Sequence, residues 1–85
     1  MPADADVKKL FGIKLAQLRK AQGMSQEALA LESGISRSYL GDVERGHRNI
    51  SLVNICRLAQ ALGLRLAEFM DFSIEHTQGK ARSLR

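Results

Sequence analysis

The chain has 85 residues, which is enough for one small domain with a modest hydrophobic core. Its 13 Lys and Arg against nine Asp and Glu give a net charge of +4, which suits a polyanionic partner without requiring one. A single cysteine, Cys56, excludes an internal disulfide, and no segment approaches the roughly 20 apolar residues of a membrane span. The opening MPADADV lacks the basic and apolar regions of a signal peptide, so we expect a cytoplasmic protein from a bacterium or its phage. Helix-forming residues outnumber strand-forming ones, which favours an all-α fold.

The first helix is expected from Val7 to Gln22, where apolar side chains recur three and four positions apart, as on one face of a helix. Asp4 or Asp6 can cap its start, and Gly23 can provide the left-handed residue that ends it. The apolar face consists of Val7, Leu10, Phe11, Leu15 and Leu18.

The next three helices share one opening pattern, which is an apolar residue, a serine, and a second apolar residue four positions after the serine. The serine hydroxyl can accept a hydrogen bond from an otherwise free N–H of the first turn, and the two apolar side chains can pack together over that turn. The pattern predicts helix starts at three places, namely Met24-Ser25 with Leu29, Ile35-Ser36 with Leu40, and Ile50-Ser51 with Ile55.

The last two helices are expected over about residues 52–62 and 66–72. Gly63 ends the first of them, and its periodicity predicts buried side chains at Leu52, Ile55, Leu58, Ala59 and Leu62. After Ser73 the periodicity is lost, and the basic residues Lys80, Arg82 and Arg85 appear. We therefore expect one domain over residues 1–72 and a basic, flexible tail over residues 73–85.

The second and third helices are too short to be stable alone, so they must pack on each other and on the first helix. Gly34 between them predicts a tight turn and a sharp crossing. Ala30, four residues earlier, is small enough for two helix backbones to approach, and Leu40, six residues later, can fill the angle between them. This spacing predicts a helix-turn-helix, whose second helix presents its N-terminal end to a groove.

At 100° per residue, with Leu40 toward the core, the third helix has a polar outer face without a large aliphatic side chain. Ser36, Val43 and Glu44 then face inward. An ordinary solvated helix would have the same composition, so the turn before this helix is what favours a groove-binding role. The outward residues are Ser38, Asp42 and Arg45, with Gly41 near the same face and Arg37 and Tyr39 at its flanks.

The segments LRKAQGMSQEALALESGISRSYLGDVERGHRNIS and LVNICRLAQALGL resemble the Cro/cI-type, or XRE-type, helix-turn-helix family of phage and bacterial repressors. The resemblance covers about residues 10–70 and combines Arg19, SQEALA, Gly34, SRSYL, VERG and LAQALG in the family's order. It implies a compact five-helix, lambda-repressor-like domain that acts as a homodimer on a near-palindromic operator. The stretch SRSYLGDVERGHRN is also similar to controller proteins of restriction-modification systems.

The resemblance further implies roles for individual residues. Arg19 and Glu44 match an internal ion pair that joins the first helix to the third. The positions that contact bases are Arg37, Ser38 and Asp42. The positions that contact the DNA backbone are Gln26, Ser36, Tyr39, Arg45, Arg48 and Asn49.

Several of these roles have alternatives. Arg37 suits a bidentate bond to guanine O6 and N7. Asp42 can accept from cytosine N4 or pair with Arg45 three residues on, and we favour the ion pair. The Tyr39 hydroxyl can bond a phosphate, or its ring can pack beside the second helix. Gln26 can contact a phosphate and also brace the opening of the third helix.

An apolar surplus remains toward the end of the domain once a small core is filled. It can complete the core or form a symmetric dimer interface around the fifth helix, and we favour the interface. The residues are Leu64, Leu66, Phe69, Phe72 and Ile74.

The sequence therefore predicts a sequence-specific double-stranded DNA-binding transcription regulator, in the first place a repressor. As a homodimer it would insert two recognition helices into successive major grooves about 34 Å apart. An antitoxin or a restriction-modification controller would use the same binding mode, whereas a helical protein-interaction module would not bind DNA. We expect no enzyme activity, no cofactor, no membrane association and no small-molecule substrate. With only His47, His76 and one cysteine, we also expect no metal site. Control by a partner protein remains an alternative.

Overall fold

The computed structural model describes residues 3–72, which form five helices and no strand. The helices are α1 (Asp4–Ala21), α2 (Gln26–Ser33), α3 (Arg37–Glu44), α4 (Leu52–Leu62) and α5 (Leu66–Phe69). The expected five-helix, all-α fold is therefore confirmed. The expected tail, which includes Ile74, lies outside the described residues.

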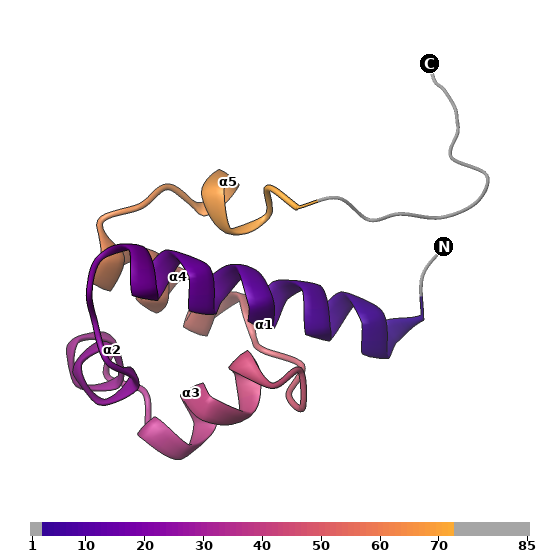
Figure 1. Ribbon diagram of the computed structural model, residues 1–85, viewed down its shortest axis with the longest axis horizontal. Helices are drawn as coiled ribbons and strands as arrows, with labels where there is room; N and C mark the ends of the chain where they lie inside the picture. The colour runs from indigo at the N-terminus through magenta and orange to yellow at the C-terminus, as the bar shows by residue number, and fades with distance from the viewer. Residues whose placement is uncertain (1–2, 73–85) are drawn as a thin grey trace.

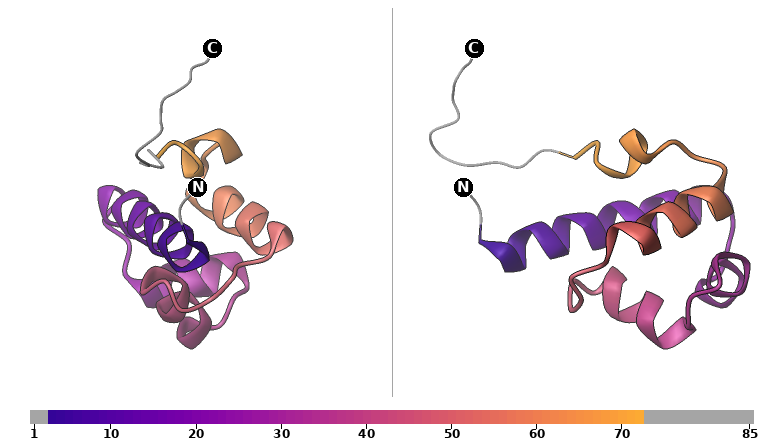
Figure 2. Two further views of the ribbon diagram at one scale, coloured as in Figure 1. Left: turned by 90° about the vertical axis from the view of Figure 1, so that its right-hand side faces the viewer. Right: turned by 180° about the vertical axis from the view of Figure 1, so that it is seen from behind.

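The long helix α1 runs through the middle of the molecule beside α4 (Figure 1). Helix α5 lies on one side of this pair, and α2 and α3 lie on the other (Figure 2). Neither α1 nor any other helix within residues 3–72 combines the length and apolar character needed to cross a membrane.

The three serine caps occur as predicted. The hydroxyls of Ser25, Ser36 and Ser51 accept hydrogen bonds of 3.0–3.1 Å from the backbone N–H three residues on. Each bond satisfies a first-turn donor, so these serines fix where α2, α3 and α4 begin.

Two other expected helix ends are wrong. Asp4 and Asp6 lie within the first turn of α1 and do not cap it; the N-cap is Ala3, which provides no side-chain bond. There the two carboxylates face the positive end of the helix dipole. Helix α5 ends at Phe69, three residues earlier than expected, and Phe72 beyond it packs against the core outside any helix.

The core lies between α1 and the other helices. Its centre includes the fully buried Leu15, Leu29, Leu40 and Leu58, one from each of the first four helices. Phe11 of α1 stacks on Phe69 of α5, with ring centroids 5.8 Å apart. Contrary to expectation, Leu52 is 70% exposed, because the first residue of α4 projects beyond the neighbouring helices.

The prediction that Phe69 belongs to a dimer interface is wrong. Its side chain is completely buried inside the protomer, where it covers Phe11 and closes the core under α5. A second copy of the chain has no access to it. Of the two alternatives for this residue, completion of the core is the one that holds.

Helix α1 comes unusually close to the end of α3 at Gly12. A Cβ atom at this position would lie 2.5 Å from the carbonyl oxygen of Val43 and 2.6 Å from that of Glu44. Only glycine fits such a contact, so this residue sets how deeply α3 rests on α1.

Candidate nucleic-acid interface

The turn between α2 and α3 is built around Gly34. Its φ of +73° is in the left-handed region, where glycine meets no steric penalty. The N–H of the next residue, Ile35, donates to the carbonyl oxygen of Ala30 at 3.1 Å, and Ile35 is itself buried. In Figure 1, α2 is seen nearly end-on while α3 runs across the view, so the two helices cross sharply, as the sequence predicts.

This turn leaves the N-terminal end of α3 at the periphery of the molecule. Arg37 and Ser38, the first two residues of the helix, are both exposed. Ser36 is exposed as well, and although its oxygen caps the helix, its hydroxyl hydrogen remains a donor. Arg37 and Ser38, which are expected to contact bases, therefore lie together with Ser36 and point away from the core. The expectation that Ser36 faces inward is wrong, because this N-cap residue has an extended backbone and does not follow the helical periodicity.

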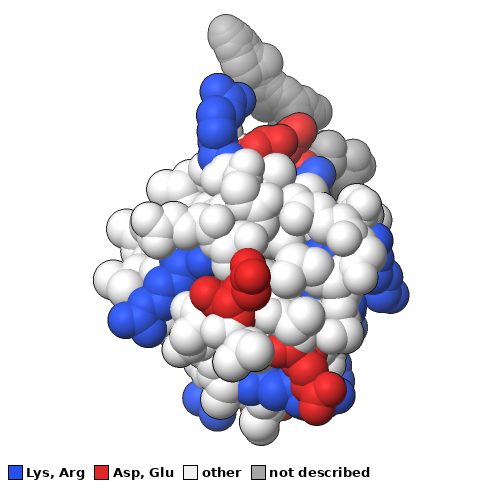
Figure 3. All heavy atoms as spheres, turned by 90° about the vertical axis from the view of Figure 1, so that its left-hand side faces the viewer, with Lys and Arg blue, Asp and Glu red and all other residues white. Residues whose placement is uncertain are grey.

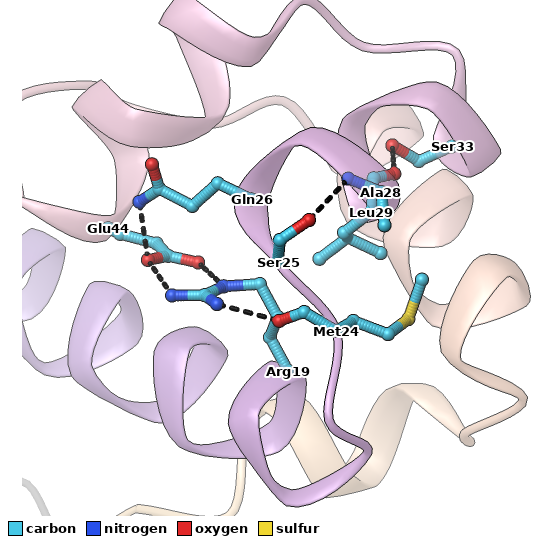
Figure 4. A network of polar contacts seen from close by, with 8 residues as sticks. All are labelled: Arg19, Met24, Ser25, Gln26, Ala28, Leu29, Ser33 and Glu44. Carbon is cyan, nitrogen blue, oxygen red and sulfur yellow. Dashed lines mark hydrogen bonds and ion pairs between the residues drawn. The ribbon is translucent and has the colours of Figure 1, made fainter.

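On its inner side, α3 is held by a polar cluster that joins three helices (Figure 4). The guanidinium of Arg19 donates to both oxygens of Glu44, from Nε at 2.7 Å and from Nη2 at 2.9 Å, and its Nη1 donates to the carbonyl oxygen of Met24 at 2.8 Å. Gln26 Nε2 donates to Glu44 Oε1 at 2.8 Å. The ion pair that the family resemblance implies is thus present, with both side chains less than one tenth exposed.

The cluster fixes the charge of its members. Burial alone would raise the pKa of Glu44, but the hydrogen bonds from Arg19 and Gln26, with the charges of Arg19 and Lys20, hold that pKa below its usual value. The same hydrogen bond, from Arg19 to Glu44, raises the pKa of the Arg19 guanidinium above its usual value. The pair is therefore ionised at neutral pH, and it connects the end of α1 to the last turn of α3.

Gln26 differs from expectation in one respect. It braces the last turn of α3, through Glu44, and not the opening of that helix. Its amide nitrogen carries a second hydrogen, which suits an anionic partner. An open hollow adjoins it, lined by Arg19, Ser25, Gln26, Glu27 and Arg37, where the starts of α2 and α3 meet.

The outer side of α3 carries a second cluster, around Asp42. Its Oδ1 accepts a hydrogen bond from Arg45 Nη2, which is the ion pair that the sequence favours, and its Oδ2 lies 3.5 Å from Arg48 Nε. The Arg48 guanidinium also lies over the ring of Tyr39, 5.2 Å from its centroid. Asn54 of α4 donates to the Tyr39 hydroxyl at 3.3 Å, so the outer cluster extends from α3 to α4.

Two residues of this region, Asn54 and Gly46, are not anticipated by the sequence, and Gly41 is buried although it was expected near the outer face of α3. Gly41 is buried beneath the side chains of Arg45 and Gln26, Asn54 holds Tyr39, and Gly46, with φ +79°, packs against the backbone of Lys9. For the two glycines, the available signal was a glycine inside or just after an amphipathic helix, which marks a close approach.

Exposed charged side chains occur on several elements of the molecule. Figure 3 views the side on which α2 lies, where basic and acidic groups are scattered among uncharged atoms. Three of the exposed arginines, Arg37, Arg45 and Arg48, belong to α3 and the loop that follows it, together with exposed Asn49. Over residues 3–72, no group of three or more His, Cys, Asp or Glu is arranged to hold a metal ion.

A glycine turn, a short capped helix with an exposed polar face, and a buried ion pair behind it define a helix-turn-helix protein. The chain belongs to the helix-turn-helix family HTH_3, which matches residues 15–69.

Two curated relatives are control proteins by name. The chain is 44% identical over 69 residues to control protein C.BamHI of Bacillus amyloliquefaciens, covering 80% of this chain and 85% of that protein. It is 42% identical over 72 residues to control protein C.MunI of a Mycoplasma species, covering 82% and 97%. The crystal structure of the restriction-modification controller protein C.AhdI from Aeromonas hydrophila matches with a TM-score of 0.74 and 53% identity, over 75% of this chain and 97% of that one.

Family, fold and relatives together identify the chain as a DNA-binding transcription regulator. The relatives named above are regulators and not enzymes, which supports a role without catalysis.

Proposed function

We propose that this regulator is the controller protein of a restriction-modification system and acts in the cytoplasm as a homodimer on a near-palindromic operator. The observation that carries the DNA-binding mode is the exposed N-terminal end of α3, held outward by the Gly34 turn and from behind by the Arg19–Glu44 pair. The restriction-modification role is supported by the likeness to C.AhdI, which is a restriction-modification controller protein by name, and C.BamHI and C.MunI are likewise named control proteins.

In this proposal α3 enters the major groove, and Arg37 and Ser38 contact bases. Arg37 has the length and the fork of donors for a guanine, and its neighbour Ser38 bonds whichever base edge lies beside it. The DNA backbone on either side of the major groove is contacted by Gln26 at the start of α2 and by residues in and next to α3. These residues are Ser36, Tyr39, Arg45, Arg48 and Asn49. These side chains lie exposed or half-buried, and they are donors of the kind that phosphates accept.

We place the dimer interface around α5. Leu66 and Met70 are 41% and 54% exposed there, and Leu64 and Phe72 beside them are only half-buried. Helix α5 lies on the opposite side of α1 from α3, as Figures 1 and 2 show, so a two-fold contact at α5 leaves both recognition helices open. Met70 is an addition to the residues expected from the sequence, and Phe69 is removed from them.

The proposal is tested by selecting bound sequences from a random duplex pool with the purified full chain. We expect a two-fold symmetric consensus, bound by a dimer in sedimentation analysis, that also occurs upstream of the genes of a DNA methyltransferase and its endonuclease. A consensus found at other genes would favour a phage repressor or an antitoxin. No enrichment over bulk DNA would reject sequence-specific binding and leave the protein-interaction module.

A further inference from the structure

Two acidic side chains in the last turn and a half of α3 have opposite surroundings. Glu44 faces inward, and its carboxylate is taken up by Arg19 and Gln26. Asp42 faces outward, on the side that the proposed function directs at DNA, where a carboxylate is repelled by phosphates. The inner acid has a structural role, whereas the outer one requires another explanation.

The contacts of Asp42 show what the outer acid does in the free protein. It holds two arginines at once, Arg45 through Oδ1 and Arg48 through Oδ2. Its side chain is 27% exposed, against 58% for Arg45 and 54% for Arg48, so the carboxylate is the most covered of the three charged groups. Arg48 is additionally held over the ring of Tyr39.

The contacts of Asp42 affect sequence-independent binding to DNA differently from binding to the operator. Sequence-independent binding depends almost entirely on cations that adapt to whichever phosphates are near, and Asp42 both offsets one positive charge and restrains two of those cations. Binding to a correctly seated operator requires the arginines in one position only, so restraining them there costs little and saves ordering entropy. The carboxylate therefore weakens attraction to wrong DNA more than attraction to the operator.

We propose that Asp42 is a specificity-determining residue that contacts no base, and that it acts by positioning Arg45 and Arg48 and limiting their attraction to non-operator DNA. The proposal rests on the proposed function, because it presupposes that α3 faces DNA. It replaces the base-contacting role that the family resemblance implies for this position.

The test compares Asp42→Asn and Asp42→Glu with the wild type and with Glu32→Gln. Glu32 is an exposed acid in the last turn of α2 without an ion pair among residues 3–72, so Glu32→Gln makes the same change of net charge elsewhere. Dissociation constants are measured over a range of salt concentrations for the selected operator and for a scrambled duplex of the same composition. Arginine Nε–H relaxation by NMR reports on the order of Arg45 and Arg48.

For Asp42→Asn we expect affinity for the scrambled duplex to rise about three- to tenfold at 0.1 M salt. The salt slope of the dimer should steepen by about 2, as for one added phosphate contact per protomer. Operator affinity should change less than about threefold, with the same consensus, and the Arg48 Nε–H signal should lose order. Asp42→Glu keeps the charge and should return most of the discrimination, whereas Glu32→Gln should leave it unchanged.

Each contrary outcome has a definite meaning. If Asp42→Asn changes the consensus at one base pair and weakens only operator binding, Asp42 contacts a base and the proposal is wrong. If Asp42→Asn and Glu32→Gln strengthen scrambled-duplex binding equally, only net charge matters and the proposal is again wrong. If the wild type selects no consensus at all, the proposed function is wrong and the role of Asp42, which presupposes it, is wrong with it; in the two preceding outcomes the wild type keeps its consensus, so only the role of Asp42 fails.

Discussion

Replacing Glu44 by glutamine tests whether the cluster behind α3 holds the fold together. The carboxylate receives two hydrogen bonds from Arg19 and one from Gln26, and the side chains of Arg19 and Glu44 are almost entirely buried. In Glu44→Gln an NH2 group replaces one of the two acceptor oxygens, so at least one of these donors faces another donor. Arg19 also keeps its charge without a counter-ion.

The expected cost follows from these losses. An unsatisfied buried donor costs about 1–3 kcal/mol, and breaking one side of a fully buried pair costs about 3–5 kcal/mol. Because the cluster lies at the edge of the core, and Arg19 keeps its bond to the Met24 carbonyl, we expect a loss of about 2–3 kcal/mol. For a domain of this size, that lowers the melting temperature by roughly 10–20 °C.

The assay is urea unfolding followed by circular dichroism at one fixed protein concentration, because the stability of a dimer depends on concentration. Glu27→Gln changes an exposed glutamate in the first turn of α2 and is the matched control, with an expected change within about 0.5 kcal/mol. Arg19→Met with Glu44→Leu removes both charges and should recover most of the stability. A Glu44→Gln protein within 0.5 kcal/mol of the control, or a double variant no more stable than the single one, would refute the reasoning.

Three further predictions concern pH, packing and base recognition. The lowered pKa of Glu44 means that its stabilising contribution is complete above the unfolded value of about 4.3 and is lost as the pH falls through the folded value. The stability difference between wild type and Glu44→Gln should therefore be constant above about pH 5 and shrink below about pH 4 in urea titrations. Gly12→Ala should cost about 2 kcal/mol or more, despite the better helix propensity of alanine, because the added Cβ meets the Val43 carbonyl oxygen; equal stability in the same assay would contradict the close approach. Arg37→Ala should lower operator affinity about 10- to 100-fold and relax one base position in a repeated selection, without changing the melting temperature. The control Arg57→Ala, at an exposed position of α4, should change neither the affinity nor the consensus. A consensus unchanged in Arg37→Ala would exclude base contact.

What the sequence predicted correctly depends on neighbouring residues. The three serine caps need only a hydroxyl and an N–H three residues on, and the Gly34 turn needs only one left-handed residue. The same reasoning from neighbouring residues failed at α1, where two closely spaced aspartates gave two possible N-caps. The helix in fact begins before both of them, with Ala3 as its N-cap.

What the sequence could not predict depends on where distant elements meet. A count of apolar residues cannot assign Phe69 to the core, because that depends on the Phe11 ring lying opposite it. The need for glycine at position 12 arises from carbonyl groups more than 30 residues away. The second arginine on Asp42 comes from the loop after α3, whose course no helical periodicity describes.

The two acidic residues near the end of α3 divide the requirements on a recognition helix between them. The hydrogen bonds of Glu44 have direction, so they fix the rotation of α3 as well as its distance from α1, which contacts between apolar side chains alone would leave free to adjust. Because Arg19, Gln26 and Glu44 come from three different helices, we expect a change at any one of them to alter the orientation of α3 and with it the direction of Arg37. Asp42 then acts on a helix whose direction is already set, and this is why its carboxylate can restrain the arginines at the end of α3 without determining how the helix packs.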